Sequence, residues 1–180
     1  LGALGATPAA GAGGSAAMGQ HTDEVRGARV PRVAVEPAVA PGAGVAGAPG
    51  RPLEGITVVD LSTIIAAPLA MAMLADLGAT VVKVEPPRGD PYRRFGKPYG
   101  DSSLLFKAAN GNKTSISLDL KSEDGIASLF ELLAEADVLI TNWRPSVAPK
   151  MGLTPERVKA EFPRLIWCRV SGYGQDGPRS

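Results

Sequence analysis

Short apolar runs alternate with longer amphipathic stretches from residue 51 onward. GITVVDLS (residues 55–62) and ATVVKVEPP (residues 79–87) are short and rich in β-branched residues, which predicts two buried strands. Between them, AAPLAMAMLADLG (residues 66–78) has helix-forming residues, an early proline and a terminal glycine, the pattern of a helix. The three segments together predict a βαβ unit, whose strands pair in parallel.

The same alternation continues to the end of the chain. KTSISLDL (residues 113–120), DVLITN (residues 137–142) and RLIWCRVS (residues 164–171) are predicted strands. Residues 121–136 form an amphipathic helix with Ser122 as its N-cap, and residues 154–162 form a short helix capped by Thr154. This order predicts an α/β fold, a doubly wound parallel sheet with flanking helices.

Residues 1–50 differ in composition from the rest of the chain. They contain 14 Ala, 11 Gly and 5 Pro, and neither an aromatic residue nor an isoleucine. Such a segment buries too little apolar surface to offset the entropy of ordering it. We therefore expect a disordered extension over residues 1–50, followed by one α/β domain over residues 51–180.

The residue types present exclude several kinds of chemistry. The single histidine, His21, lies in the extension, so the α/β domain cannot form a Ser-His-Asp triad or a histidine-ligated zinc site. The single cysteine, Cys168, rules out an internal disulfide and fits a reducing, cytoplasmic location. The net charge of +1 and the lack of an 18-residue apolar run give no indication of nucleic-acid or membrane binding.

The predicted strand ends carry polar and turn-forming residues, and ligands of such sheets bind at the carboxyl ends of the strands. The first turn, LSTIIAAPLA (residues 61–70), lacks the Gly-x-Gly-x-x-Gly fingerprint of dinucleotide-binding proteins. The connection from Pro86 to Asn112 is unusually long, which indicates either a functional or a disordered segment. Between Pro86 and Lys121 there are seven Lys or Arg and three Asp, a surplus that suits an anionic ligand or an ordinary solvated loop.

Four stretches, taken together, resemble the class III CoA-transferases. They are residues 51–96, 110–125 (NGNKTSISLDLKSEDG), 136–158 (ADVLITNWRPSVAPKMGLTPERV) and 163–178 (PRLIWCRVSGYGQDGP). The family includes formyl-CoA transferases, carnitine-CoA transferases and α-methylacyl-CoA racemases. The resemblance implies the N-terminal part of a CoA-binding domain with a Rossmann-like parallel sheet and flanking helices. It also implies an interlocked homodimer, and coenzyme A or acyl-CoA as substrate, with no tightly bound cofactor and no metal.

The resemblance also implies which residues contact CoA. Two residues depart from the family pattern: Pro86 replaces an arginine, whose phosphate contact is either lost or supplied by Arg88, and Lys150 replaces another arginine. The implied CoA-binding residues are Ile65, Ala66, Arg88, Leu118, Asp119, Leu120, Lys121, Asn142, Trp143, Arg144 and Lys150.

The family's nucleophilic aspartate lies beyond the Gly-Tyr-Gly segment at residues 172–174, and therefore beyond Ser180. We assign no catalytic residue within the chain, and we expect the 180 residues alone to be an inactive N-terminal fragment. The implied reaction moves CoA between an acyl-CoA and a small carboxylic acid through an aspartyl intermediate. The stretch SSLLFKAANGNKTSISLDLK (residues 102–121) resembles the transferases more than the racemases. A racemase-like member and a non-catalytic CoA-binding fragment remain the alternatives.

Overall fold

The structure is a computed structural model that describes residues 50–178. The predicted disordered extension therefore lies outside the described residues, except for Gly50. The single histidine, His21, lies outside them as well. With 3₁₀ helices labelled η, the elements are β1 (Thr57–Asp60), α2 (Ala66–Asp76), β2 (Thr80–Glu85), η1 (Pro91–Arg94), β3 (Pro98–Tyr99), β4 (Ser102–Ser103), α3 (Leu104–Ala109), β5 (Thr114–Ser117), α4 (Glu123–Ala134), β6 (Val138–Thr141), η2 (Ala148–Met151), α5 (Pro155–Glu161) and β7 (Ile166–Arg169).

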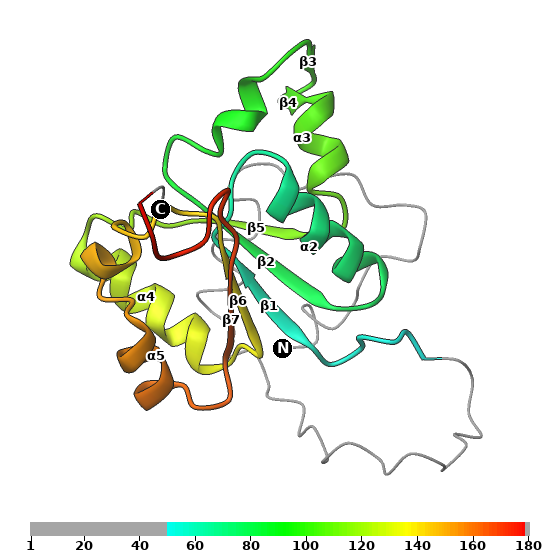
Figure 1. Cartoon of the computed structure of the whole chain (residues 1–180). Coiled ribbons are helices and arrows are strands. Elements are labelled where there is room, and N and C mark those ends of the chain that lie inside the picture. Colours follow the sequence, from blue (N-terminus) through cyan, green and yellow to red (C-terminus); the bar gives the residue numbers. More distant parts are fainter. Residues whose placement is uncertain (1–49, 179–180) are drawn as a thin grey trace.

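Five strands form one parallel sheet in the order β5-β2-β1-β6-β7, as Figure 1 shows. This confirms the predicted α/β fold class. The chain builds outward from β1 through β2 to β5, and then returns to the other side of β1 for β6 and β7. The connection after β1 therefore leads to one side of β1, and the connection into β6 leads to its other side. Open α/β sheets bind ligands at such a reversal of strand order, outside the carboxyl ends of the strands.

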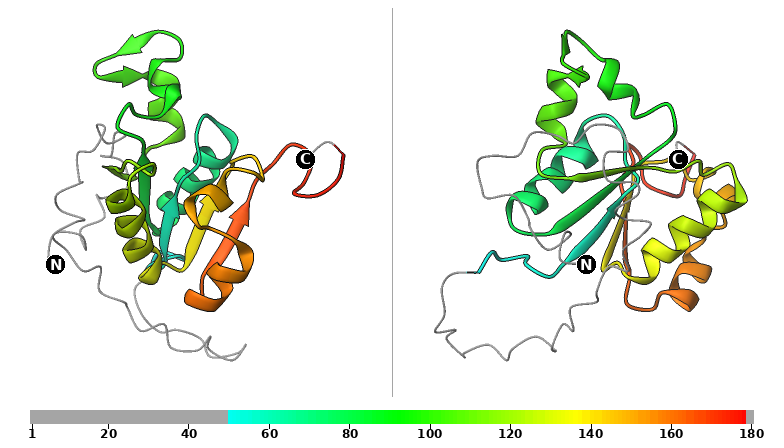
Figure 2. Two further views of the ribbon diagram at one scale, coloured as in Figure 1. Left: turned by 90° about the vertical axis from the view of Figure 1, so that its left-hand side faces the viewer. Right: turned by 180° about the vertical axis from the view of Figure 1, so that it is seen from behind.

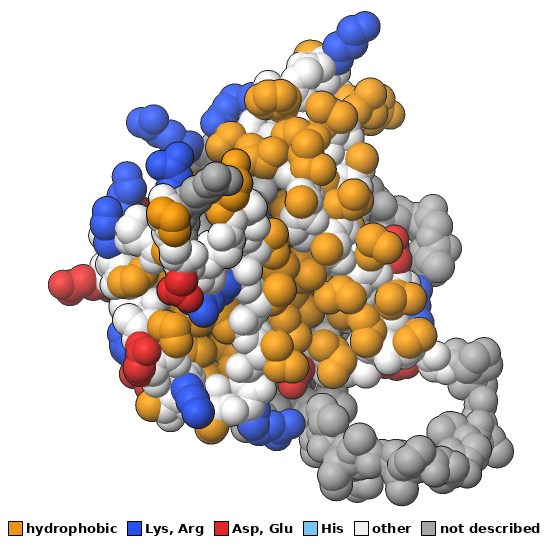
Figure 3. Space-filling view, viewed as in Figure 1, with side chains coloured by type: hydrophobic (Ala, Val, Ile, Leu, Met, Phe, Trp, Pro, Cys, Tyr) orange, Lys and Arg blue, Asp and Glu red, His pale blue; other side chains and the backbone are white. Residues whose placement is uncertain are grey.

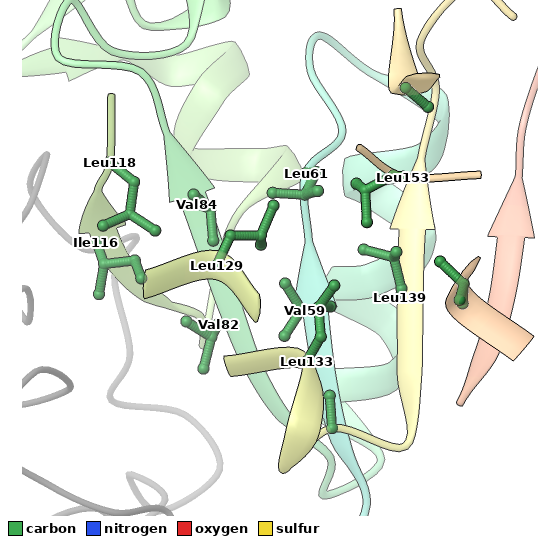
Figure 4. Close-up of a cluster of buried hydrophobic side chains, with 13 residues drawn as sticks. Val59, Leu61, Val82, Val84, Ile116, Leu118, Leu129, Leu133, Leu139 and Leu153 are labelled. Atoms are coloured by element: carbon green, nitrogen blue, oxygen red, sulfur yellow. The ribbon is translucent and has the colours of Figure 1, made fainter. Parts of the chain in front are cut away.

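Helices cover both faces of the sheet, as the two views of Figure 2 show. Helix α2 packs on one face, where Val58, Ala67, Met71, Ala75 and Val81 form a buried cluster. Helices α4 and α5 cover the other face, and Figure 4 shows Leu129 and Leu133 of α4 against strand residues of β1, β2, β5 and β6. Apolar side chains on both faces explain why the central strands read as continuous hydrophobic runs.

The cap residues expected from the sequence are confirmed. Ser122 Oγ accepts a hydrogen bond from Gly125 N at 3.1 Å, and Thr154 Oγ1 accepts one from Arg157 N at 3.3 Å. Each hydroxyl satisfies one of the backbone donors that a helix leaves open at its start. Both helices therefore begin where the sequence places them.

The long connection from Pro86 to Asn112 forms defined elements, which contradicts the disordered alternative, while its function stays a prediction. It contains η1, the β3–β4 hairpin and α3, which Figure 1 shows projecting beyond the carboxyl edge of the sheet. Tyr92, Phe106 and Ala109 form its own buried cluster. Sequence periodicity missed these elements because each is only two to six residues long.

Candidate functional site

The segments that follow the five strands lie along one edge of the sheet, because all the strands run in parallel. The β1–α2 turn occupies the middle of this edge. Asn142, which follows β6, binds the turn with both ends of its amide: its Oδ1 accepts from Thr63 N at 3.0 Å and its Nδ2 donates to Thr63 O at 2.8 Å. The structure therefore brings the first predicted contact region next to Asn142, although 79 residues separate Thr63 from Asn142 in the chain.

The β1–α2 turn is strained at Ile64. Its φ of 71° lies in the left-handed region, where an L-residue other than glycine loses about 1–2 kcal/mol. A β-branched residue there is a true outlier, and such strain collects at ligand-binding segments. The next residue, Ile65, is the N-cap of α2 and makes no side-chain cap hydrogen bond within the described residues. The first amides of α2 are thus left without a side-chain acceptor beside the exposed residues Ile65 and Ala66.

A cluster of buried charges lies directly beneath this turn. Lys83 Nζ is 3.0 Å from Asp90 Oδ2, and Lys113 Nζ is 2.8 Å from Asp60 Oδ2, with all four side chains almost fully buried. Lys113 Nζ also donates to Pro68 O at 2.7 Å and to Asn110 Oδ1 at 2.9 Å. Each buried ammonium is therefore paired with a carboxylate, as burial of a charge requires.

A third ion pair extends the cluster along β2. Arg93 binds Glu85 with two nitrogens, Nε to Oε2 at 2.7 Å and Nη2 to Oε1 at 2.6 Å. Ser115 Oγ donates to Glu85 Oε1 at 2.6 Å, and Asp90 N donates to Glu85 Oε2 at 2.9 Å. The paired geometry is the bidentate one that suits guanidinium and carboxylate. Glu85, the last residue of β2, is thereby neutralised from within the protein.

The acidic members of the cluster have lowered pKa values. Burial alone would raise the pKa of Asp60, but the charges of Lys83 and Lys113 bring it below its ordinary value. Burial alone would also raise the pKa of Glu85. The hydrogen bonds from Arg93 and Ser115 outweigh burial, so the pKa of Glu85 is lowered too. Burial lowers the pKa of Lys113 to about 8, against the attraction of Asp60. Both carboxylates are therefore ionised at neutral pH.

This cluster corrects the interpretation of the basic surplus between Pro86 and Lys121. Arg93 and Lys113 are committed to buried carboxylates and are not available as a clamp for an anion. Lys107 lies 3.4 Å from Asp101, and Arg94 donates to Arg88 O at 2.8 Å. The Arg88 side chain is exposed, and its contact with CoA stays a prediction.

The predicted contact segment 118–121 follows β5 and forms a tight turn. Leu118 is 2% exposed and packs in the core, whereas Asp119 and Lys121 are exposed. Asp119 Oδ1 accepts from Lys121 N at 3.0 Å, and Asp119 O accepts from Ser122 Oγ at 2.8 Å. Gly125 of α4 lies against this turn, because a Cβ on Gly125 would overlap Asp119 O. The turn and the first turn of α4 thus form one packed unit.

Two of the four predicted residues after β6 line a small pocket of about 40 Å³. Trp143 and Arg144 contribute to its wall, and Arg169 of β7 and Gln175 complete it from the next strand. Trp167 Nε1 donates to Thr141 Oγ1 at 3.1 Å, which ties the two strands together at the pocket. Lys150 lies exposed on η2, whose Pro149 also lines the pocket. The Gly-rich segment near the end of the chain therefore supplies Gln175 to this edge.

The structure thus gathers the predicted residues at one edge, although several side chains face inward. It also places there residues that sequence reasoning did not select, above all Lys83 and Asp90. The signal for Lys83 was present, since a lysine inside the apolar strand TVVKVE contradicts the pattern of a buried strand. No group of three or more His, Cys, Asp or Glu residues able to hold a metal lies within residues 50–178. No helix of that region is long and apolar enough to cross a bilayer.

Comparison with known proteins identifies the family. Residues 53–180 match the sequence profile of CoA-transferase family III. This chain belongs to CoA-transferase family III. The match confirms the resemblance found in the four sequence stretches, and its residue range begins close to the predicted boundary of the α/β domain.

Individual relatives agree with the family profile. The chain is 42% identical over 131 residues to (R)-2-hydroxy-4-methylpentanoate CoA-transferase of Clostridioides difficile, covering 70% of this chain and 33% of that protein. It is 41% identical over 132 residues to succinyl-CoA:glutarate CoA-transferase of Homo sapiens, covering 72% and 30%. A CaiB/BaiF family protein from Brucella suis has a similar structure, with a TM-score of 0.67, 42% identity, and coverage of 71% and 35%. The chain spans about a third of the length of the relatives it matches.

Proposed function

We propose that this family III chain is the N-terminal CoA-binding part of a CoA-transferase, which moves CoA between an acyl-CoA and a carboxylic acid. The observation that carries the proposal is the match over residues 53–180 to the family, with curated CoA-transferases about 42% identical. The exposed predicted residues, such as Ile65, Lys121 and Arg144, follow β1, β5 and β6 at the edge where parallel sheets bind ligands.

The nucleophile of the proposed reaction is an aspartate outside residues 1–180. Three acidic residues at this edge, Asp60, Glu85 and Asp90, are buried and paired with cations, so none of them presents a carboxylate to a substrate. A carboxylate nucleophile is ionised at neutral pH and needs no general base, which agrees with an α/β domain free of histidine. In this scheme the carboxylate attacks the thioester carbonyl and CoA leaves as a thiolate. The thiolate then attacks the aspartyl carbonyl of the mixed anhydride, which releases the donor acid and leaves an aspartyl-CoA thioester. The acceptor carboxylate attacks this thioester, and the CoA thiolate finally attacks the acceptor carbonyl of the second anhydride, which releases the new acyl-CoA and the free aspartate.

CoA titration of the 180-residue chain by calorimetry tests the binding part of the proposal. We expect Arg144→Ala and Trp143→Ala to weaken CoA binding about tenfold each, the scale of one lost hydrogen bond to a charged group or one lost ring contact. Arg157→Ala is the matched control, because Arg157 is exposed on α5 and pairs with Glu161 at 2.6 Å. A chain that folds and binds no CoA, or an equal loss in the control, contradicts this assignment.

The transferase step is tested on a protein that carries this chain together with the remaining length of its relatives. Acyl-CoA donors are incubated with carboxylic acids and the new thioesters are separated by chromatography. Hydroxylamine cleaves an aspartyl thioester or anhydride, so it should leave a hydroxamate on one aspartate, detected by mass spectrometry. Movement of the α-proton of a methylacyl-CoA without transfer would favour the racemase alternative.

We further propose that the protein assembles as a homodimer through an apolar face over α2 and α3. Figure 3 shows hydrophobic side chains gathered on this face. Met73 is 61% exposed, Leu69 and Leu77 are 44% and 45% exposed on the same helix, and Leu104 of α3 is 55% exposed. Exposed apolar surface of this extent marks an interaction site. Light scattering should show a dimer. Met73→Glu should shift the dimer toward monomer, whereas the control Lys159→Glu should not. A monomeric wild type would refute the proposed dimer.

A further inference from the structure

Lys83 and Asp90 connect β2 and the loop after it to the β1–α2 turn. Lys83 is 1% exposed, and its Nζ donates to Ser62 O at 2.9 Å and lies 3.0 Å from Asp90 Oδ2. Asp90 Oδ1 accepts from Tyr92 N at 2.9 Å and makes a longer contact of 3.4 Å with Ile64 N. The two side chains therefore hold the carbonyl that enters the turn and the amide of its strained residue.

The fold by itself does not require this buried pair. Position 83 lies within a strand between Val82 and Val84, where an apolar side chain would fill the space without the cost of desolvating an ammonium group. Replacing a buried ion pair by apolar residues is often neutral or stabilising. An apolar side chain could not, however, donate to Ser62 O. The bond to the turn is thus what the lysine adds.

The turn depends on such bonds because its own backbone opposes its conformation. Ile64 has a φ of 71°, which β-branched residues avoid, and its side chain is only partly buried, at 37% exposed. If the bonds from Lys83 and Asp90 are lost, the residue can relax toward a right-handed or extended conformation. That rotation would move Ile65 and Ala66, which directly follow it.

We propose that Lys83 and Asp90 are positioning residues of the CoA site: they hold the β1–α2 turn so that Ile65 and the first amides of α2 meet CoA. This inference rests on the proposed CoA-binding function. It assigns a role in ligand binding to two buried side chains that are not themselves in reach of a ligand. Substitutions of these residues should therefore lower the CoA affinity by more than their effect on folding stability explains.

The test compares Lys83→Met, Asp90→Asn and Asp90→Ala in the 180-residue chain. CoA affinity is measured by calorimetry, the melting temperature by circular dichroism, and the conformation of the turn by the amide NMR signals of residues 63–66. Asp90→Asn keeps an oxygen for Ile64 N and Tyr92 N, and is the conservative variant. Leu133→Ala is the control, because Leu133 is fully buried in the last turns of α4 and packs on the opposite face of the sheet from α2.

We expect Lys83→Met and Asp90→Ala to weaken CoA binding about tenfold, the scale of one charge-assisted hydrogen bond, and to shift the amide signals. Asp90→Asn should restore part of the affinity. Leu133→Ala should lower the melting temperature at least as much, with less than a twofold change in affinity. If affinity and amide signals follow stability alone in all variants, the inference is overturned. If the wild type binds no CoA, the proposed function fails, and the amide signals still decide whether the pair positions the turn.

Discussion

Replacing Lys113 by methionine tests the buried charge cluster most directly. The ammonium makes bonds of 2.8 Å to Asp60, 2.7 Å to Pro68 O and 2.9 Å to Asn110, and its side chain is 1% exposed. Methionine fills a similar volume but leaves Asp60 buried without the cation that pairs with it. Breaking a buried pair in this way costs about 3–5 kcal/mol, a large part of the roughly 5–15 kcal/mol by which a domain is stable.

Urea unfolding followed by circular dichroism at pH 7 measures this loss. Lys159→Met is the matched control, since Lys159 is exposed on α5 and its replacement should change the unfolding free energy by less than about 0.5 kcal/mol. The double variant Asp60→Asn with Lys113→Met should cost less than the two single changes together, by about 1 kcal/mol or more, because it removes both charges.

The pH dependence of the Lys113→Met variant carries a definite sign. Without Lys113, the pKa of Asp60 rises, because burial then opposes ionisation with one cation fewer nearby. The folded variant takes up a proton on Asp60 at a higher pH than the wild type does. The cost of the substitution should therefore be smaller at pH 5 than at pH 7. A loss below 1 kcal/mol at pH 7, or the same loss at both pH values, would refute the reasoning.

Three further outcomes are expected. A Gly to Ala substitution inside a helix normally stabilises a protein by about 1 kcal/mol. Gly125→Ala should instead lower the unfolding free energy measured in urea, because the new Cβ overlaps Asp119 O. A higher unfolding free energy would show that the 118–121 turn can move away at little cost. The pKa values of Asp60 and Glu85 are lowered in the folded state, so the two ionised carboxylates stabilise the fold at pH values above their unfolded pKa values of 3.8 and 4.5. This stabilisation should be lost as the pH falls below those values, which an acid titration by circular dichroism checks. Ile64→Gly should be more stable in urea unfolding than Ile64→Ala, by about 1 kcal/mol, because glycine adopts the φ of 71° without the left-handed strain that alanine keeps. Equal stability of the two variants would count against strain at this position.

The hydrophobic pattern by itself determined the elements that build the sheet. Runs such as TVVD and VLIT are short, apolar on both faces and bounded by turn residues, so they predict buried parallel strands whatever surrounds them. The caps at Ser122 and Thr154 follow from interactions within four residues of the chain. Local chemistry of this kind is visible in the sequence because partners close in the chain are fixed by helix or strand geometry.

Only the tertiary structure decided which charges are free to bind a ligand. The basic surplus after β2 looks like a clamp in the sequence, yet the structure pairs Arg93 with Glu85 and Lys113 with Asp60, 8 and 53 residues away. The link between Thr63 and Asn142 spans 79 residues and exists only because β1 and β6 are neighbours in the sheet. Strand order sets such contacts, and spacing along the chain does not encode it. The sequence therefore determined the scaffold and the family, whereas folding determined which side chains hold the turn and which remain for the ligand.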